Sequence, residues 1–137
     1  MSLSVWVGRS RYEIGSASFL NSFFSTIYVR LENEDWGSRY PLVMGPFYEG
    51  KLAASDSASA QAELEAIRAA LACYPPEDIV WDHEDRAAAP PWGASISAHI
   101  TSLANYFVTS DGKDLIGVLG AAFRDAARTR HDVVIGE

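Results

Sequence analysis

The chain has 137 residues, a formal net charge of −7 and an isoelectric point near 4.9. This length suits one domain that buries its own core, and we expect a single domain over residues 1–137. The excess of acidic side chains argues against binding to nucleic acid or to an anionic membrane, because both require a basic surface. The same excess suits solubility, or attraction to a basic protein partner.

The cysteine content and the N-terminus give no sign of an oxidising compartment. Cys73 is the single cysteine of the chain, so an internal disulfide is excluded, and we expect it to be a small packing residue. The first residues lack the basic and apolar segments of a signal peptide, and no apolar run approaches the roughly 18 residues of a membrane span. The sequence therefore predicts a cytoplasmic protein with no membrane partner.

The N-terminal half alternates predicted strands with one long helix. Apolar residues recur at spacings of three and four from Phe19 to Leu31, which predicts a helix that Ser16 or Ser18 can cap. Pro41 would place the strand that follows at an edge, because proline cannot donate to a ladder. In chain order we expect a β-hairpin from residues 3–7 and 11–14, the helix, a polar break at 32–35, a strand at 40–44, a turn at Gly45–Pro46 and a short return segment at 47–52.

The C-terminal half contains two further predicted helices. An alanine-rich helix is expected over 58–73, and a third helix begins near Leu115. Gly117 and Gly120 in the third helix suggest tight packing against a neighbour. Short apolar runs predict strands at 79–81, 106–109 and 132–136. We therefore expect an α+β fold, with a mostly antiparallel sheet and about three helices packed against it.

The stretch after residue 79 concentrates the side chains that chemistry would use. Three interpretations are open for Asp82, His83, Glu84 and Asp85: a metal site, an acid/base pair or a docking surface. Composition alone does not choose between them. On an extended strand end, alternation would send Asp82 and Glu84 to one face and His83 and Asp85 to the other, which suits a metal cage poorly. We therefore expect neither a metal nor another cofactor. A small metal-dependent hydrolase using Asp82, His83 and Asp85 is the enzyme alternative.

A docking surface requires less of the sequence, namely aromatic anchors within a charged surround. Five acids and no basic residue lie between Glu77 and Asp85, and two prolines precede Trp92. A second, weaker patch is predicted near the polar break. The predicted contact residues are Asp82, Glu84, Asp85 and Trp92, with Glu34, Asp35 and Trp36 as the second patch. A subunit that self-associates through its aromatic surface is a third hypothesis.

Several uncommon motifs, in this order, resemble the Immunity protein 70 family over about residues 5 to 125. They are Tyr12-Glu-Ile-Gly-Ser16, Ser22-Phe-Phe-Ser-Thr-Ile27, Trp36-Gly-Ser-Arg39, Tyr48-Glu-Gly-Lys-Leu52, Pro75-Pro76, Trp81-Asp82 with Glu84-Asp85, Pro90-Pro-Trp-Gly93 and Asn105-Tyr-Phe-Val-Thr-Ser-Asp-Gly112. The chain departs from the family pattern in Ala87-Ala-Ala89 and in the glycines of the third helix.

The resemblance implies a bacterial immunity protein of a polymorphic toxin system, without catalytic residues. Such a protein binds and neutralises a toxin encoded by a neighbouring gene. A toxin that acts on nucleic acid would be basic, so the acidic residues of this chain could attract it and cover its active site. We therefore expect a non-enzyme whose partner is a cognate toxin domain.

Overall fold

Within residues 2–93 and 95–137, which the computed structural model describes, the regular elements are four strands and three α-helices. The strands are β1 (Ser2–Val7), β2 (Ser10–Ser16), β3 (Lys51–Leu52) and β4 (Val133–Gly136), and the helices are α1 (Ala17–Thr26), α2 (Ser57–Leu71) and α3 (Leu115–Thr129). All strand pairs are antiparallel, in the order β2-β1-β4-β3. The predicted α+β fold with a mostly antiparallel sheet and about three helices is confirmed.

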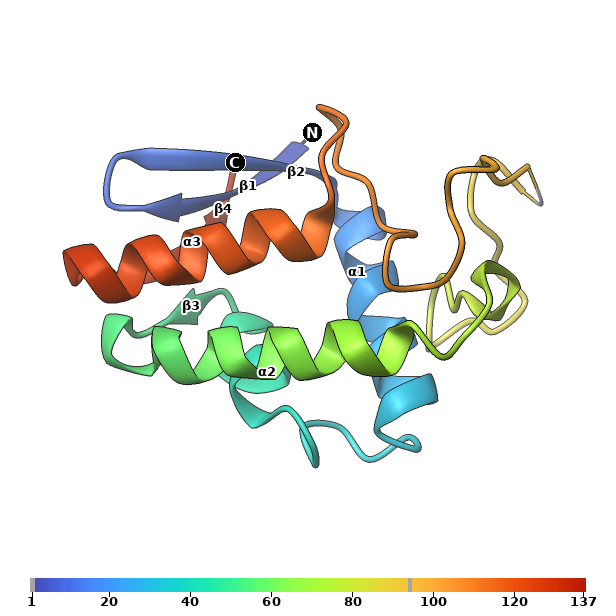
Figure 1. Ribbon diagram of the computed structural model, residues 1–137, viewed down its shortest axis with the longest axis horizontal. Coiled ribbons are helices and arrows are strands. Elements are labelled where there is room, and N and C mark those ends of the chain that lie inside the picture. The colour runs from blue at the N-terminus through green and yellow to red at the C-terminus, as the bar shows by residue number, and fades with distance from the viewer. Residues whose placement is uncertain (1, 94) are drawn as a thin grey trace.

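Helix α3 packs on the sheet, α2 packs against α3, and α1 closes one end. In Figure 1, α3 lies along the sheet, α2 runs beside α3 in the opposite direction, and α1 crosses near the end of both helices. An ion pair joins the two long helices, since Arg68 Nη2 lies 2.8 Å from Asp114 Oδ2. The long segments without regular structure gather on the far side of α1 from the β1–β2 turn. This arrangement separates a regular end from a loop end.

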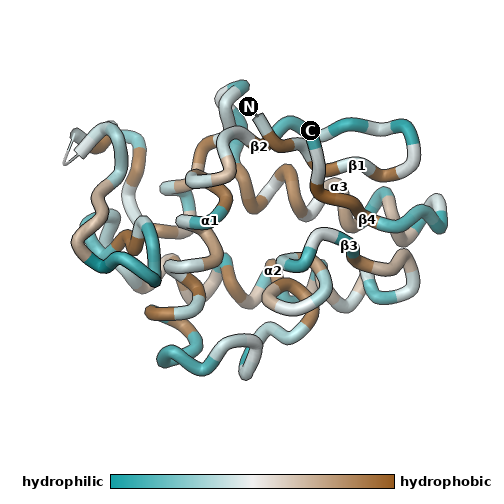
Figure 2. Tube along the Cα trace, turned by 180° about the vertical axis from the view of Figure 1, so that it is seen from behind, coloured by the Kyte–Doolittle hydropathy of each residue, from teal (hydrophilic) through white to brown (hydrophobic). Residues whose placement is uncertain are grey.

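The core lies where α1, α3 and the sheet meet, and Figure 2 shows hydrophobic segments gathered there, with hydrophilic residues on the outer turns. Aromatic rings join the elements across it. Phe23 of α1 packs edge-on against Phe107 at 5.3 Å, and Phe47 packs edge-on against Phe123 of α3 at 5.0 Å. All four rings are fully or almost fully buried. Such contacts fix the loop end to the helices through apolar burial.

Helix α1 is the central element of the fold. Ser16 caps it as predicted, because its Oγ accepts the backbone N–H of Phe19 at 3.1 Å. A π-helical segment, η1 (Ile27–Leu31), continues the helix to the predicted end. The helix is buried nearly all round from Phe19 to Ile27, and its buried positions include hydroxyl side chains such as Ser25 and Thr26. Buried hydroxyls require partners, and they find them in the loops.

The strand predicted at 40–44 and the turn predicted at Gly45–Pro46 are wrong, because the chain is helical from Pro41 through the π-helical η2 (Val43–Phe47). Glu63 of α2 explains the difference. Its carboxylate accepts the backbone N–H of Leu42 at 3.1 Å and that of Val43 at 2.9 Å, which caps the start of this helical turn. The return segment predicted at 47–52 is reduced to the two residues of β3.

Two further strand predictions are wrong. Residues 79–81 form no strand, and the strand predicted at 106–109 is reduced to an isolated bridge between Val108 and Asp114. In the first case Thr26 of α1 replaces a neighbouring strand. Its hydroxyl donates to the Val80 carbonyl at 3.2 Å and accepts the Val80 N–H at 3.1 Å. The predicted hairpin, the three helices and the closing strand have counterparts at the expected positions.

Two residue-level predictions are also corrected. Cys73 is exposed rather than a packing residue, because α2 ends at the buried Leu71 and Cys73 lies in the exposed turn that follows. Gly120 is buried, yet a Cβ built on it would meet nothing within 4 Å, so tight packing does not explain this glycine. At Gly117 the nearest atom to such a Cβ is Oδ2 of Asp114, the residue that caps α3, at 3.1 Å.

Candidate protein-binding surface

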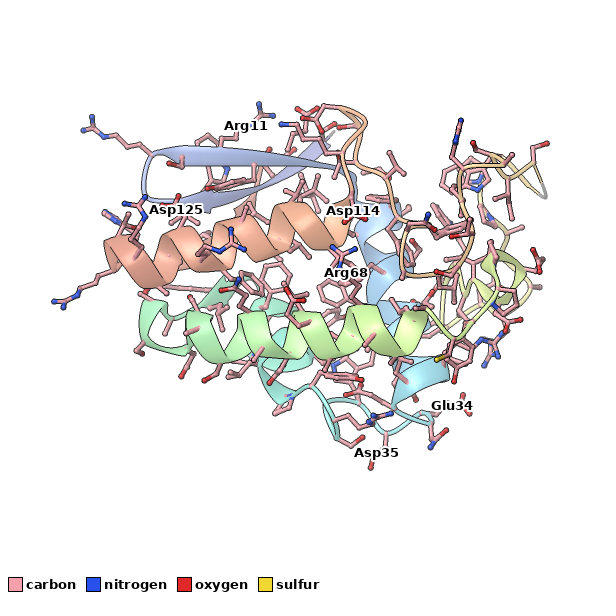
Figure 3. The ribbon with its side chains drawn as sticks, viewed as in Figure 1. Arg11, Glu34, Asp35, Arg68, Asp114 and Asp125 are labelled. Carbon is pink, nitrogen blue, oxygen red and sulfur yellow. The ribbon has the colours of Figure 1, made fainter. Side chains whose placement is uncertain are left out.

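The two acidic segments predicted from the sequence as separate patches lie side by side at the loop end. The ring of Trp36 lies 5.2 Å from that of His83. Arg86 Nη1 lies 3.5 Å from Glu34 Oε1, which links the same two segments at their exposed edge. The labelled Glu34 and Asp35 lie at the outer edge of the molecule in Figure 3. We define the acidic face as Glu34, Asp35, Trp36, Asp82, Glu84 and Asp85.

Trp36 of the acidic face belongs to an aromatic cluster with Phe24, Tyr28, Tyr48 and His83. Trp36 is its centre, with ring centroids 5.1 Å from Tyr28 and 4.7 Å from Tyr48. The indole N–H of Trp36 donates to the Met44 carbonyl at 2.6 Å, which fixes the ring. Tyr48 is 42% exposed, so the cluster reaches the surface there. Rigid aromatic rings within a charged surround are typical of protein interfaces.

His83 faces inward and its polar atoms are used in holding the loop. Its backbone N–H donates to Ser25 Oγ at 3.0 Å, and its Nδ1 lies 3.1 Å from the same oxygen. The ring packs against Tyr28 and Trp36, each at 5.2 Å. Only 18% of the His83 side chain is exposed, against 82% for Glu84. The imidazole therefore anchors the segment to α1, and this geometry does not favour the hydrolase alternative.

Residues 82–85 form a turn rather than an extended strand end. The Glu84 N–H donates to Asp82 Oδ1 at 3.0 Å, and the Ala87 N–H donates to Asp85 Oδ1 at 3.2 Å. The alternation expected for a strand is therefore wrong here. The two aspartates shape the turn, while the Glu84 carboxylate projects into solvent. Among residues 2–93 and 95–137, no three His, Cys, Asp or Glu side chains are grouped to hold a metal ion.

The second half of the acidic face lies on a loop shaped by a buried carboxylate. Glu32 is 1% exposed. Its two oxygens accept the backbone N–H groups of Gly37, Arg39 and Tyr40 at 3.0, 3.1 and 3.1 Å. Hydrogen bonds of this kind compensate a buried charge for its lost hydration. The exposed Glu34 and the half-buried Trp36 lie between these anchor points.

Trp92 lies apart from the aromatic cluster. Its ring packs edge-on against Trp81 at 5.4 Å, and its indole N–H donates to the Tyr106 hydroxyl at 2.9 Å. Burial raises the pKa of Tyr106, and the bond from Trp92 opposes that rise. Trp92 is 42% exposed and lines an apolar groove of about 260 Å³ that includes Ile96 and Val108. Trp92 thus lies outside the acidic face, and its ring contacts Trp81, the residue that precedes Asp82.

One protein-family model matches this chain. The model described as Immunity protein 70 matches residues 5–135, which is nearly the whole chain. The chain belongs to the Immunity protein 70 family. Membership implies an immunity protein that acts against a toxin. No curated protein and no solved structure matches the chain.

Several residues that build this surface were missed by sequence reasoning, because each acts through a side-chain contact that periodicity and composition do not report. They are Ser25, Thr26, Tyr28, Glu32, Tyr48 and Arg86. The one available signal was the presence of hydroxyl side chains on a helix that is otherwise apolar. Within residues 2–93 and 95–137, no helix is long and apolar enough to cross a membrane.

Proposed function

We propose that the chain binds and neutralises a cognate bacterial toxin encoded nearby, as a stoichiometric protein inhibitor of a polymorphic toxin or contact-dependent inhibition system. Asp82, Glu84, Asp85, Trp92, Glu34, Asp35 and Trp36 are the proposed contact residues. The observation that carries the proposal is the contact between Trp36 and His83, which joins two acidic segments into one surface over rigid aromatic rings. The proposed site of action is the cytoplasm.

The chemistry of the surface favours a basic toxin domain, such as a nuclease. Complementary charge speeds association and selects the partner, while a few aromatic anchors supply most of the binding free energy. Trp36 is such an anchor candidate, because it is half-buried and fixed by a hydrogen bond to the Met44 carbonyl. Bound in this way, the immunity protein would cover the active site of a nuclease with negative charge.

Charge removal tests the proposal directly. The variant Asp82→Asn, Glu84→Gln, Asp85→Asn removes three negative charges but retains carbonyl oxygens for the turn. We expect association with the inactivated toxin domain of the neighbouring gene to slow about tenfold at low salt, with a weaker salt dependence. Protection in a co-expression assay should fall accordingly. The measurements are stopped-flow association rates at several salt concentrations and growth of the co-expressing strain.

A matched control removes the same charge elsewhere. The variant Asp56→Asn, Glu65→Gln, Glu137→Gln alters three acids whose side chains make no hydrogen bond or ion pair within the described part of the chain. We expect it to bind the toxin domain at nearly the original rate. Equal slowing by both variants would point to net charge alone, and unchanged binding by the first variant would exclude this surface.

A further inference from the structure

Building on the toxin-binding function proposed above, on which this inference rests, we infer that Glu32 and Ser25 are positioning residues for toxin recognition. Neither side chain reaches the surface, since Glu32 is 1% exposed and Ser25 is fully buried. Each holds one half of the acidic face in a fixed conformation before the toxin arrives. The surface is therefore preorganised by two polar side chains in the C-terminal half of the same helical unit, Ser25 near the end of α1 and Glu32 directly after η1.

Glu32 holds the half that carries Glu34 and Trp36. Its carboxylate accepts three backbone N–H groups, all on the far side of the loop. The near side is held by the Glu34 N–H, which donates to the Tyr28 carbonyl at 2.9 Å. The loop is thus closed at both ends, and the three N–H groups compensate the buried carboxylate for its lost hydration.

The backbone of this loop is strained at the residue that is proposed to contact the toxin. Asn33 and Glu34 have φ values of 50° and 61°, in the left-handed region that costs energy for residues other than glycine. A free loop would relax to negative φ and redirect the Glu34 carboxylate. The bonds to Glu32 oppose this relaxation. The exposed Glu34 is therefore strained, and the buried Glu32 holds the loop in that conformation. Such an arrangement is consistent with a fixed contact geometry.

Ser25 holds the other half of the face. Its hydroxyl oxygen accepts the His83 backbone N–H and lies within hydrogen-bond distance of His83 Nδ1. This pair fixes the imidazole between Tyr28 and Trp36. The ring stack is therefore where the two anchored halves meet. Loss of either anchor should loosen the relative placement of the acids on both loops.

Preorganisation affects affinity through the fraction of molecules that are competent to bind. When that fraction falls, the apparent dissociation constant rises in proportion, even though every contact residue is still present. Charge steering is not affected in the same way, because no exposed carboxylate is removed. A positioning residue therefore lowers affinity without changing the salt dependence of association, which distinguishes it from Asp82, Glu84 or Asp85.

The test compares two positioning variants with two matched controls. Glu32→Gln is paired with Glu63→Gln, because the Glu63 carboxylate also accepts backbone N–H groups but outside the loop. Ser25→Ala is paired with Ser22→Ala, because Ser22 is equally buried on α1 and its hydroxyl donates to the Phe19 carbonyl. Affinity for the inactivated toxin domain is measured by titration calorimetry well below the melting temperature of each variant.

We expect Glu32→Gln and Ser25→Ala to weaken binding about tenfold with an unchanged salt dependence, while both controls lose thermal stability and keep their affinity. Ser25→Ala removes a single oxygen atom, so the test stands even if Glu32→Gln fails to fold. Equal weakening by variants and controls would overturn the positioning role. Unchanged affinity in both positioning variants would also overturn the positioning role. If the variant at Asp82, Glu84 and Asp85 still weakened binding, the proposed function would stand without it.

Discussion

The sheet with α2 and α3 and the loop end around α1 are built by different interactions. In the first region, backbone ladders join β1 to β2 and to β4, and apolar side chains pack the helices against them. In the second, side chains of α1 and η1 bond to the backbone of the loops, as Arg30 does when its Nε donates to the Asp78 carbonyl at 2.9 Å. Residues 79–93 and 95–114 contain no helix or named strand.

This difference shows how one chain can separate scaffold from recognition. Loops this long without regular structure are uncommon in compact domains and are usually functional. Here a few buried polar groups take the place of the ladder, so the conformation of the loops depends on those groups. A region held in this way should open locally at a lower free energy than the sheet. The following predictions test that contrast.

The largest effect is expected from Phe123→Ala, because this fully buried ring of α3 packs against Phe47 and belongs to the core shared by both regions. We expect a loss of about 3–5 kcal/mol in the free energy of unfolding, with both regions unfolding together in urea. Val134→Ala, at a 39% exposed position of β4, is the control and should cost far less. A loss below about 1 kcal/mol would contradict a common core.

A smaller and more local effect is expected from Thr26→Val, which preserves shape but removes both bonds to Val80. Leaving two buried backbone groups unsatisfied should cost about 2 kcal/mol. Amide hydrogen exchange should accelerate in residues 78–86 and stay unchanged in β1 and β4. Thr129→Val, at an exposed position of α3, serves as the control. Uniform acceleration over the whole chain would show that the two regions open as one unit.

A stabilising effect is expected from Gly120→Ala in α3. Because a Cβ there meets nothing within 4 Å, the substitution should gain about 0.5–1 kcal/mol through the higher helix propensity of alanine. Gly117→Ala should gain less, since its Cβ would lie 3.1 Å from Oδ2 of the capping Asp114. Urea denaturation of both variants measures the difference. If Gly120→Ala destabilised the protein, the result would support the prediction from the sequence that this glycine packs tightly against a neighbour.

The smallest effect on stability at neutral pH is expected from the ionisation of two tyrosines, one in each region. Burial raises the pKa of Tyr12 and of Tyr106, and at Tyr12 the hydrogen bond to Asp125 acts in the same direction. A raised pKa means that the folded state retains these protons after the unfolded chain, whose value is near 10.0, begins to lose them. Their contribution to stability is therefore complete below pH 10 and is lost as the pH rises further.

Urea denaturation between about pH 8 and pH 11.5 measures this loss, with tyrosinate absorbance as the second readout. The variant Tyr12→Phe should reduce the pH dependence and lose the bond to Asp125, which has a length of 2.9 Å. Tyr106→Phe tests the loop end, where the hydroxyl accepts the Trp92 indole N–H. Stability that stays level through this range would contradict the raised pKa of both groups.

The helices and the hairpin could be predicted because their signals are local. Apolar spacing along 19–31 and the capping residue Ser16 lie within the element that they specify. The strands predicted at 40–44 and 79–81 were wrong because short apolar runs carry no such signal. Their conformation is decided by Glu63 and Thr26, whose side chains bond to them from distant parts of the sequence.

By itself the sequence determined the acidic excess, the three helices and the resemblance to the family that the comparison then showed. Only the tertiary structure decided that Trp36 meets His83 and that Glu32 is buried while Glu34 is exposed. The physical reason is that periodicity and composition depend on residues that are neighbours in the sequence. A binding surface assembled from two loops depends instead on how α1 brings them together.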